Sequence, residues 1–220
     1  MKIIKDTRHG LARPINEIKK VFGIPIEIEE KNLDEIFQKT TKFEGYQDSA
    51  LNLKEIIDEE KNTMIITDKD IFIDEEDYNQ SWILGYQLDN LTVVSTARIK
   101  RYDNKPSKKL TVPYNKFLKR LNSIVIHEIG HDVVTGNHLK EAFWITHDGY
   151  KMELGPHCTD NKCVMYEIVD ITIPPKEEGF MLLGKEKKYD TGMDEKLKKQ
   201  YPEYFCKKCS ESIKIGKEFY

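Results

Sequence analysis

The chain has 220 residues, with 35 Lys and Arg against 38 Asp and Glu, which gives a formal net charge of -3. This balance argues against a protein that binds nucleic acid or an anionic membrane, because such proteins carry an excess or a stripe of basic residues. The length fits one domain, which we divide into an N-terminal part, about 1–136, and a C-terminal part, about 137–220.

The first residues lack the apolar segment and the small-residue cleavage site of a signal peptide. No run in the sequence approaches the roughly 18 apolar residues that a membrane-spanning helix needs. We therefore expect a cytoplasmic protein, monomeric and without a membrane partner. In that compartment its four cysteines are expected to be metal ligands and not disulfides.

The first part of the chain alternates helical and extended patterns. Residues 13–22 have apolar side chains at helical spacing, and Gly23 closes the segment. Residues 24–29 alternate apolar and polar, which predicts a half-buried strand. Residues 45–49 are typical of a turn, and 50–61 have a helical apolar face.

The following segments predict a sheet with helices packed on it, an α/β arrangement. Short apolar runs at 63–67 and 91–95 predict strands buried on both faces. A turn is expected at 68–70 and a polar linker at 102–109. A helix should then begin with Pro113 in its first turn, continue a little beyond His131, and stop near Gly136.

This last helix contains H-E-x-x-H. Because positions four apart lie on one helix face, His127 and His131 can direct two imidazoles to one metal ion. Glu128 is rotated by about 100° from His127 and can instead reach a water molecule. Two histidines with an adjacent carboxylate are typical of zinc hydrolases, in which the glutamate is the general base.

A zinc site of this kind needs a third protein ligand. The sequence offers four further histidines and two nearby glutamates as candidates: His9, His138, His147, His157, Glu141 and Glu153.

The cysteines form two close pairs, C-x4-C at Cys158 and Cys163 and C-x-x-C at Cys206 and Cys209. Two such pairs can supply the four thiolates of a closed tetrahedral zinc site. A closed sulfur shell has no position for water, so this second site is expected to be structural.

The ordered motifs resemble those of the archaemetzincins, zinc metallopeptidase-like members of the metzincin clan. The resemblance rests on H-E-x-x-H at 127–131, H-C-x4-C-x-M at 157–165 and F-C-x-x-C at 205–209. Two upstream segments, 64–72 and 93–98, resemble a family strand that ends in an Asp-rich turn and a second family segment. The resemblance extends from about residue 45 to residue 209.

The resemblance implies a metzincin-like α/β (α+β) fold, in which a twisted mixed sheet lies over an active-site helix and a small C-terminal subdomain is held by zinc. It implies two zinc ions per chain, one catalytic and one structural. The resemblance implies that Glu128 is the general base and that the catalytic zinc is bound by His127, His131 and His157. It implies that the structural zinc is bound by Cys158, Cys163, Cys206 and Cys209. Met165 would be the residue of the Met-turn.

The chain departs from the family in spacing. The family has five residues between the second and third histidines, whereas 25 separate His131 from His157 here. Either 137–155 is an insertion that returns His157 to the zinc, or His138 is the ligand. A second insertion is expected at about 174–200, within the 40 residues between Met165 and Cys206. Longer loops cost little closure entropy, so neither insertion prevents the two sites from forming.

The leading hypothesis is a zinc-dependent metallopeptidase that acts on a peptide or protein substrate. Two alternatives remain open. One is a catalytically weak or inactive zinc-binding protein whose insertions cover the cleft or bind a partner. The other is an enzyme that hydrolyses a non-peptide amide.

Overall fold

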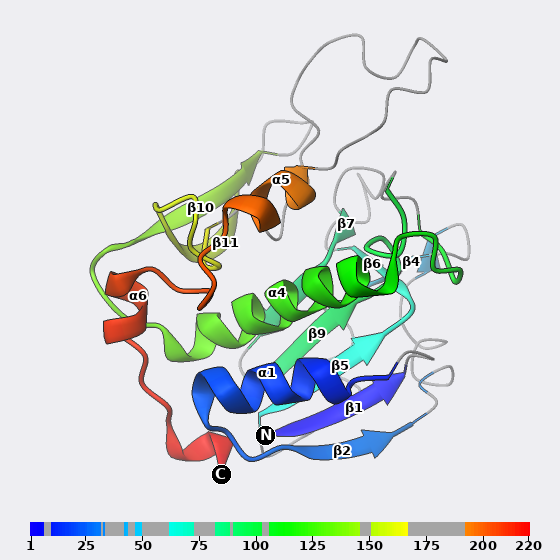
Figure 1. The fold of residues 1–220 in the computed structure, drawn as a ribbon, viewed down its shortest axis with the longest axis horizontal. Coiled ribbons are helices and arrows are strands. Elements are labelled where there is room, and N and C mark those ends of the chain that lie inside the picture. Colours follow the sequence, from blue (N-terminus) through cyan, green and yellow to red (C-terminus); the bar gives the residue numbers. More distant parts are fainter. Residues whose placement is uncertain are drawn as a thin grey trace, which may run out of the picture.

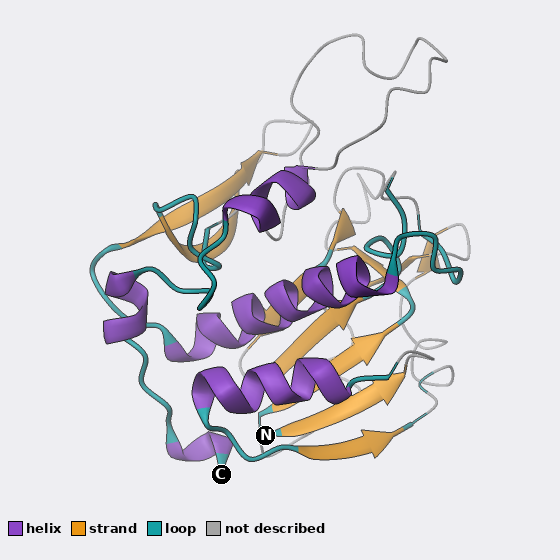
Figure 2. Ribbon diagram, viewed as in Figure 1, coloured by secondary structure: helices purple, strands orange, loops and turns teal. Residues whose placement is uncertain are grey.

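The computed structural model describes residues 1–6, 10–31, 33, 42–43, 47–49, 62–72, 82–88, 90–102, 106–145, 151–166 and 192–220. Its main sheet has five strands in the order β2-β1-β5-β9-β8. Four of these strands are parallel, and β8 is antiparallel to β9, so the expected mixed α/β sheet is confirmed (Figure 2). The strand bounds are Lys2–Asp6 (β1), Glu27–Glu30 (β2), Thr63–Thr67 (β5), Gly85–Leu88 (β8) and Leu91–Ser95 (β9).

Both faces of the central strands are covered. Every residue of β5 and β9 is buried, which confirms the two strands predicted from continuous apolar runs. Because side chains alternate along a strand, Met64 and Val94 belong to one core cluster, while Ile65 and Val93 belong to the cluster on the other face.

Two helices, α1 (Ala12–Phe22) and α4 (Tyr114–Val133), cover the same face of this sheet (Figure 1). The predicted helix 13–22 and its end at Gly23 are confirmed. Gly23 has a left-handed backbone with φ of 67°, and its N–H donates to the Lys19 carbonyl. The apolar side chains of α1 pack in the same cluster as those of α4.

A smaller sheet, in the order β3-β4-β6-β7, packs against the other face of the main sheet. Ile71 of β6 and Ile83 of β7 lie in the core cluster there. Its strands are Lys42–Phe43 (β3), Gln47–Ser49 (β4), Asp70–Phe72 (β6) and Trp82–Ile83 (β7).

Two local predictions in this half of the chain are wrong. Residues 47–49, expected in a turn, form strand β4 because they pair with β6. The strand predicted at 24–29 begins at Glu27, and Ile28 is 50% exposed and not half-buried. The reason is tertiary, since β2 is an edge strand. The helix predicted at 50–61 lies outside the described residues.

Helix α4 confirms the predicted motif helix but differs at its two ends. Pro113 precedes the helix as its N-cap, with an extended ψ of 140°, and does not lie in the first turn. The helix ends at Val133, because Val134 is extended and forms a β-bridge with Ile213. Gly136, the expected stop, lies in the turn beyond, with φ of 147°.

The C-terminal part forms a β-hairpin and short helices, of which α6 lies by the carboxyl end of α4, while α5 packs over the half of α4 that begins at Tyr114 (Figure 1). Among the described helices, none has the length and apolar character needed to cross a membrane. These elements are β10 (Leu139–Ile145), β11 (Lys151–Cys158), α5 (Gly192–Lys199), α6 (Lys207–Glu211) and the 3-10 helix η2 (Lys217–Phe219).

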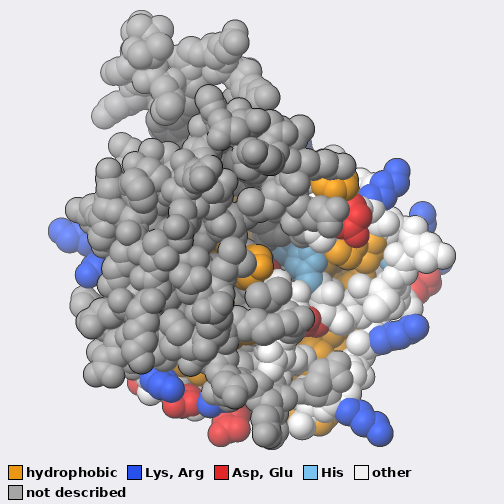
Figure 3. Space-filling model, turned by 180° about the vertical axis from the view of Figure 1, so that it is seen from behind, with side chains coloured by type: hydrophobic (Ala, Val, Ile, Leu, Met, Phe, Trp, Pro, Cys, Tyr) orange, Lys and Arg blue, Asp and Glu red, His pale blue; other side chains and the backbone are white. Residues whose placement is uncertain are grey.

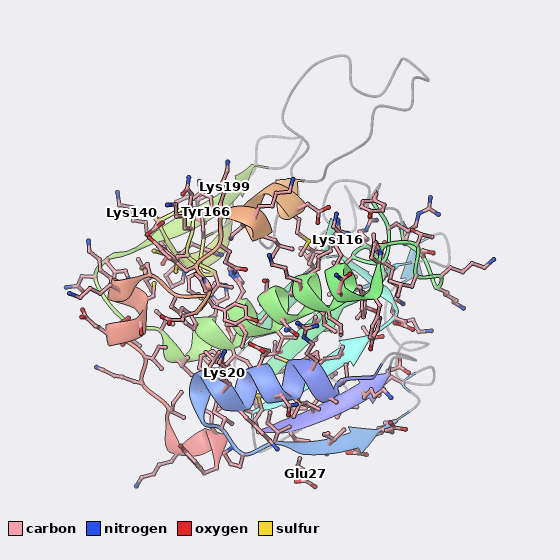
Figure 4. The ribbon with its side chains drawn as sticks, viewed as in Figure 1. Lys20, Glu27, Lys116, Lys140, Tyr166 and Lys199 are labelled. Carbon is pink, nitrogen blue, oxygen red and sulfur yellow. The ribbon has the colours of Figure 1, made fainter. Side chains whose placement is uncertain are left out.

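A buried guanidinium joins α4 to α5. The side chain of Arg120 is fully buried and donates from Nε and a terminal nitrogen to Asp194, at 2.9 and 2.8 Å. Its other terminal nitrogen donates to the carbonyls of Ile99 and Arg101. Lys116, on the side of α4 that faces α5, also donates to Asp194 at 2.9 Å (Figure 4). Asp194 therefore fixes α5 to the helix that carries the motif.

The variant Asp194→Ala should lower the free energy of unfolding by about 3–5 kcal/mol, because it removes the carboxylate bound to a buried charge. Denaturant titration measures this loss. Lys116→Ala is the matched control, since its side chain is 33% exposed and should cost below about 1 kcal/mol. An equal loss of unfolding free energy in both variants would contradict the importance of the pairing between Asp194 and the buried Arg120.

Candidate metal centres

Helix α4 brings His127 and His131 together on one face. Their Nε2 atoms lie 3.0 Å apart, and their ring centroids 4.7 Å. Two ligands on a tetrahedral zinc, with Zn–N bonds of about 2.0 Å, are roughly 3.3 Å apart. The two imidazoles therefore have the separation that one shared ion requires.

His157 joins these two histidines from strand β11. Its ring centroid lies 5.2 Å from that of His127 and 4.7 Å from that of His131. One ligand atom from each of the three residues lies within 4.8 Å of the other two. Three imidazoles with room for a fourth ligand are a known catalytic zinc arrangement.

The long interval between His131 and His157 is occupied by the β10–β11 hairpin. Leu139 pairs with Cys158, and Lys140 with His157, so the chain returns beside the point from which it left α4. The predicted insertion therefore brings His157, which follows it, back to His127 and His131. The sequence had not predicted that the insertion is a paired hairpin.

A β-bulge in this hairpin orients His157. The register shifts between Ala142 and Phe143, and Gly155 on the opposite strand has φ of 82°, a conformation that favours glycine. The Gly155 carbonyl accepts a hydrogen bond from His157 Nδ1 at 2.9 Å. The bulge therefore supplies the acceptor that directs the other ring nitrogen toward the cluster.

His127 is oriented in the same way. Its Nδ1 lies 2.6 Å from the carbonyl oxygen of Val164. When Nδ1–H donates to a carbonyl, Nε2 keeps its lone pair for a metal ion, and the ring cannot turn freely. His127 and His157 are both buried, whereas His131 is half-buried.

The other candidates for a third ligand lie elsewhere. His138 Nε2 is 3.2 Å from Cys209 Sγ, so this histidine lies at the cysteine cluster. The side chain of Glu141 is exposed. His9 and His147 lie outside the described residues, as does the side chain of Glu153.

Glu128 lies one residue beyond His127 and is 2% exposed. Its side chain approaches strand β8 at Gly85 so closely that a Cβ there would lie 2.1 Å from Oε1. Sequence patterns did not single out Gly85. The only signal was a glycine preceding a short extended run.

Met165 packs directly against the motif helix. A Cβ on Gly130 would lie 2.2 Å from Met165 Sδ, so the glycine between the two helical histidines leaves room for this thioether. The carbonyl of Met165 accepts a hydrogen bond from the Cys158 N–H at 2.8 Å. The methionine predicted beneath the histidine cluster therefore lies against the helix that carries His127 and His131.

The four cysteines also converge, and all four are buried. Their sulfur atoms lie within 4.8 Å of one another, and the Cys158 and Cys206 sulfurs are 3.7 Å apart. In a tetrahedral site with Zn–S bonds of about 2.3 Å, two sulfurs lie roughly 3.8 Å apart. The cluster therefore has the dimensions of a closed four-thiolate zinc site.

Backbone N–H groups point at these sulfurs. Asp160 N is 3.4 Å from Cys158 Sγ, and Cys206 N is 3.3 Å from Cys163 Sγ. Cys209 N is 3.5 Å from Cys206 Sγ, at the start of α6. Donors arranged around sulfur favour the thiolate form, which is the form that binds metal.

The thiols cannot all ionise on their own. A hydrogen bond from the Cys209 thiol lowers the pKa of Cys163 to about 6. Burial raises the pKa of Cys158 to about 11. The pKa of Cys209 is also raised, first because its thiol proton is shared with Cys163. A divalent cation bound here would supply the positive charge that lets every thiol ionise.

One histidine of the cluster is partly accessible: His131 is half-buried, whereas His127 and His157 are buried. Figure 3 shows histidine surface on the face opposite to that of Figure 1, next to hydrophobic side chains. Among the described residues, the cluster is therefore not fully enclosed at His131.

No family model matches this sequence, and no curated protein matches it. Among solved structures, the chain is similar to the archaemetzincin from Archaeoglobus fulgidus crystallised with malonate, with a TM-score of 0.55 and 17% identity, over 97% of this chain and 100% of that one. It is also similar to a zinc-dependent peptidase from Methanocorpusculum labreanum, with a TM-score of 0.48 and 15% identity, over 96% and 98% of the two chains. The first comparison confirms the expected resemblance in fold: over nearly its whole length, this chain has the fold of an archaemetzincin.

Proposed function

We propose that this chain is a zinc-dependent metallopeptidase that hydrolyses peptide bonds in a peptide or protein substrate. The observation that carries the proposal is the convergence of His127, His131 and His157 beside the buried carboxylate of Glu128. The fold shared with an archaemetzincin supports it.

The histidine cluster fits a catalytic zinc ion. His127, His131 and His157 would bind the ion through ring nitrogens, and the fixed Nδ1 contacts of two of them would keep the ligands in place. When bound, zinc lowers the pKa of a water molecule toward neutrality and polarises the scissile carbonyl. The substrate would approach at the half-buried His131.

Glu128 is the general base in this proposal. It follows His127 directly, so the helix turns its carboxylate to the side of the imidazoles and not among them. The carboxylate would take a proton from the attacking water and deliver it to the nitrogen of the leaving amine. Its burial shields this transfer from bulk solvent.

The cysteine cluster would hold a second, structural zinc ion. Four thiolates close the coordination shell, so no position is left for water or substrate. The ion would join Cys158 and Cys163, next to the third histidine, to Cys206 and Cys209 near the C-terminal end. The proposed content is therefore one zinc at each of the two clusters.

Replacing the general base should separate metal binding from hydrolysis. Glu128→Gln should keep the wild-type zinc content and lose about 10²–10⁴-fold in the rate of hydrolysis, because an amide cannot accept the proton. The measurements are cleavage of a quenched fluorescent peptide library and elemental analysis of zinc. Glu141→Gln, at an exposed glutamate, is the control and should cleave at the wild-type rate. Undiminished cleavage by Glu128→Gln would refute the assignment.

The third ligand can be identified by zinc stoichiometry. His157→Ala should lose the zinc of the histidine cluster, because two imidazoles hold the ion too weakly during dialysis. His138→Ala should keep that zinc, since its ring faces Cys209. Elemental analysis after dialysis measures both. The opposite result would make His138 the ligand.

The structural zinc is tested through stability. Cys206→Ser should lose the zinc of the cysteine cluster and lower the Tm by roughly 10 °C or more, because zinc binding there is coupled to folding. Ser210→Ala, at an exposed position of the same helix, is the control. A Cys206→Ser protein with wild-type zinc content and Tm would rule out the structural role.

A further inference from the structure

Strand β8 is an edge strand of the main sheet, and its first residue, Gly85, pairs with Val94 of β9. The carboxyl arm of Glu128 lies directly over this glycine. A Cβ on Gly85 would lie 2.1 Å from Oε1, 2.4 Å from Cδ and 2.7 Å from Cγ of Glu128. Real Cβ atoms do not approach other heavy atoms so closely. The Glu128 carboxyl arm therefore occupies the space that any side chain at residue 85 would fill.

The glycine is required for space and not for backbone conformation. Gly23, Gly136 and Gly155 have positive φ values, and Gly85 is not among them. At Gly85 an alanine would adopt the same strand geometry without backbone strain. The steric cost of adding a methyl group therefore falls first on its contact with Glu128, which supplies its three nearest heavy atoms.

The two backbones in this contact cannot move apart easily, whereas the flexible Glu128 side chain can rotate. β8 is held by hydrogen bonds to β9, which is itself fully buried. The backbone that carries Glu128 is fixed on both sides. The His127 ring is hydrogen-bonded to the Val164 carbonyl, and Gly130 packs against Met165. Added atoms at residue 85 must therefore displace the Glu128 carboxylate.

We propose that Gly85 is a positioning residue, whose missing side chain sets the place of the Glu128 carboxylate beside the histidine cluster. The catalytic consequence rests on the proposed peptidase function, whereas the steric contact does not. The three heavy atoms nearest to a Cβ on Gly85 all belong to Glu128, so Gly85 acts through that residue in this proposal.

The catalytic consequence is tested with Gly85→Ala. Its kcat should fall by roughly 100-fold, because a displacement of about 1 Å misplaces the base. Zinc content should stay at the wild-type level, and KM should stay within about threefold, since metal ligands and substrate contacts are kept. A wild-type kcat, or the loss of zinc from the histidine cluster, would overturn the positioning role.

The steric contact is tested through stability in two backgrounds. Gly85→Ala should lower the Tm by roughly 3–10 °C in the wild-type protein, because it overpacks a buried contact. In Glu128→Ala the carboxyl arm is gone, so the same substitution should leave the Tm within about 1 °C. An equal loss in both backgrounds would mean that the methyl group meets something other than Glu128.

Gly10→Ala is the matched control, since a Cβ there meets only the Tyr114 hydroxyl, at 4.0 Å. It should change the Tm equally in both backgrounds and leave kcat unchanged. If the wild-type protein cleaves no peptide, the peptidase proposal fails, and the Tm comparison still decides whether Gly85 and Glu128 are in contact. If the wild-type protein cleaves peptides and the two Tm losses for Gly85→Ala are equal, only the Gly85 proposal fails.

Discussion

Residues 157–165 contribute to both ligand clusters, so the position of each cluster depends on the other. Successive side chains of a strand point to opposite faces, which directs His157 to the helical histidines and Cys158 to the other cysteines. Further along the same segment, the Val164 carbonyl fixes the ring of His127. A closed cysteine site would therefore steady two of the three histidines through the backbone. This connection gives the cysteine cluster its importance for the candidate active site.

Buried charge and close packing hold the remaining parts in place. The Asp-rich turn after β5 is neutralised by two cations: the buried Lys100 lies 2.6 Å from Asp68, and the half-buried Arg98 lies 2.7 Å from Asp70. The Arg98–Asp70 pair joins the two upstream segments, 64–72 and 93–98. Around the motif helix, glycines let a carboxylate and a thioether approach the backbone, where any larger residue would displace them. Charge pairing and the absence of side chains thus shape the site as much as its ligands do.

Local sequence patterns were sufficient to predict the elements whose helical or apolar pattern lies within their own residues. Helical periodicity predicted α1 and α4, and continuous apolar runs predicted β5 and β9. Strands β1 and β8 were missed, because their short sequences show no clear alternation and they form only by pairing with β5 and β9. The exposure of Ile28 was also unpredictable, since it depends on β2 lying at the sheet edge.

The sequence by itself determined the chemistry of both candidate sites, because residue types and their spacing along one helix or one short turn specify which donors can meet. Only the tertiary structure decided between His157 and His138 as the partner of the helical histidines, since strand pairing of β10 with β11 places one at each cluster. It also revealed Gly85, whose role depends on a contact between residues 43 positions apart in the chain. Such contacts leave no periodic signal, because they arise from packing between elements and not from the conformation within one.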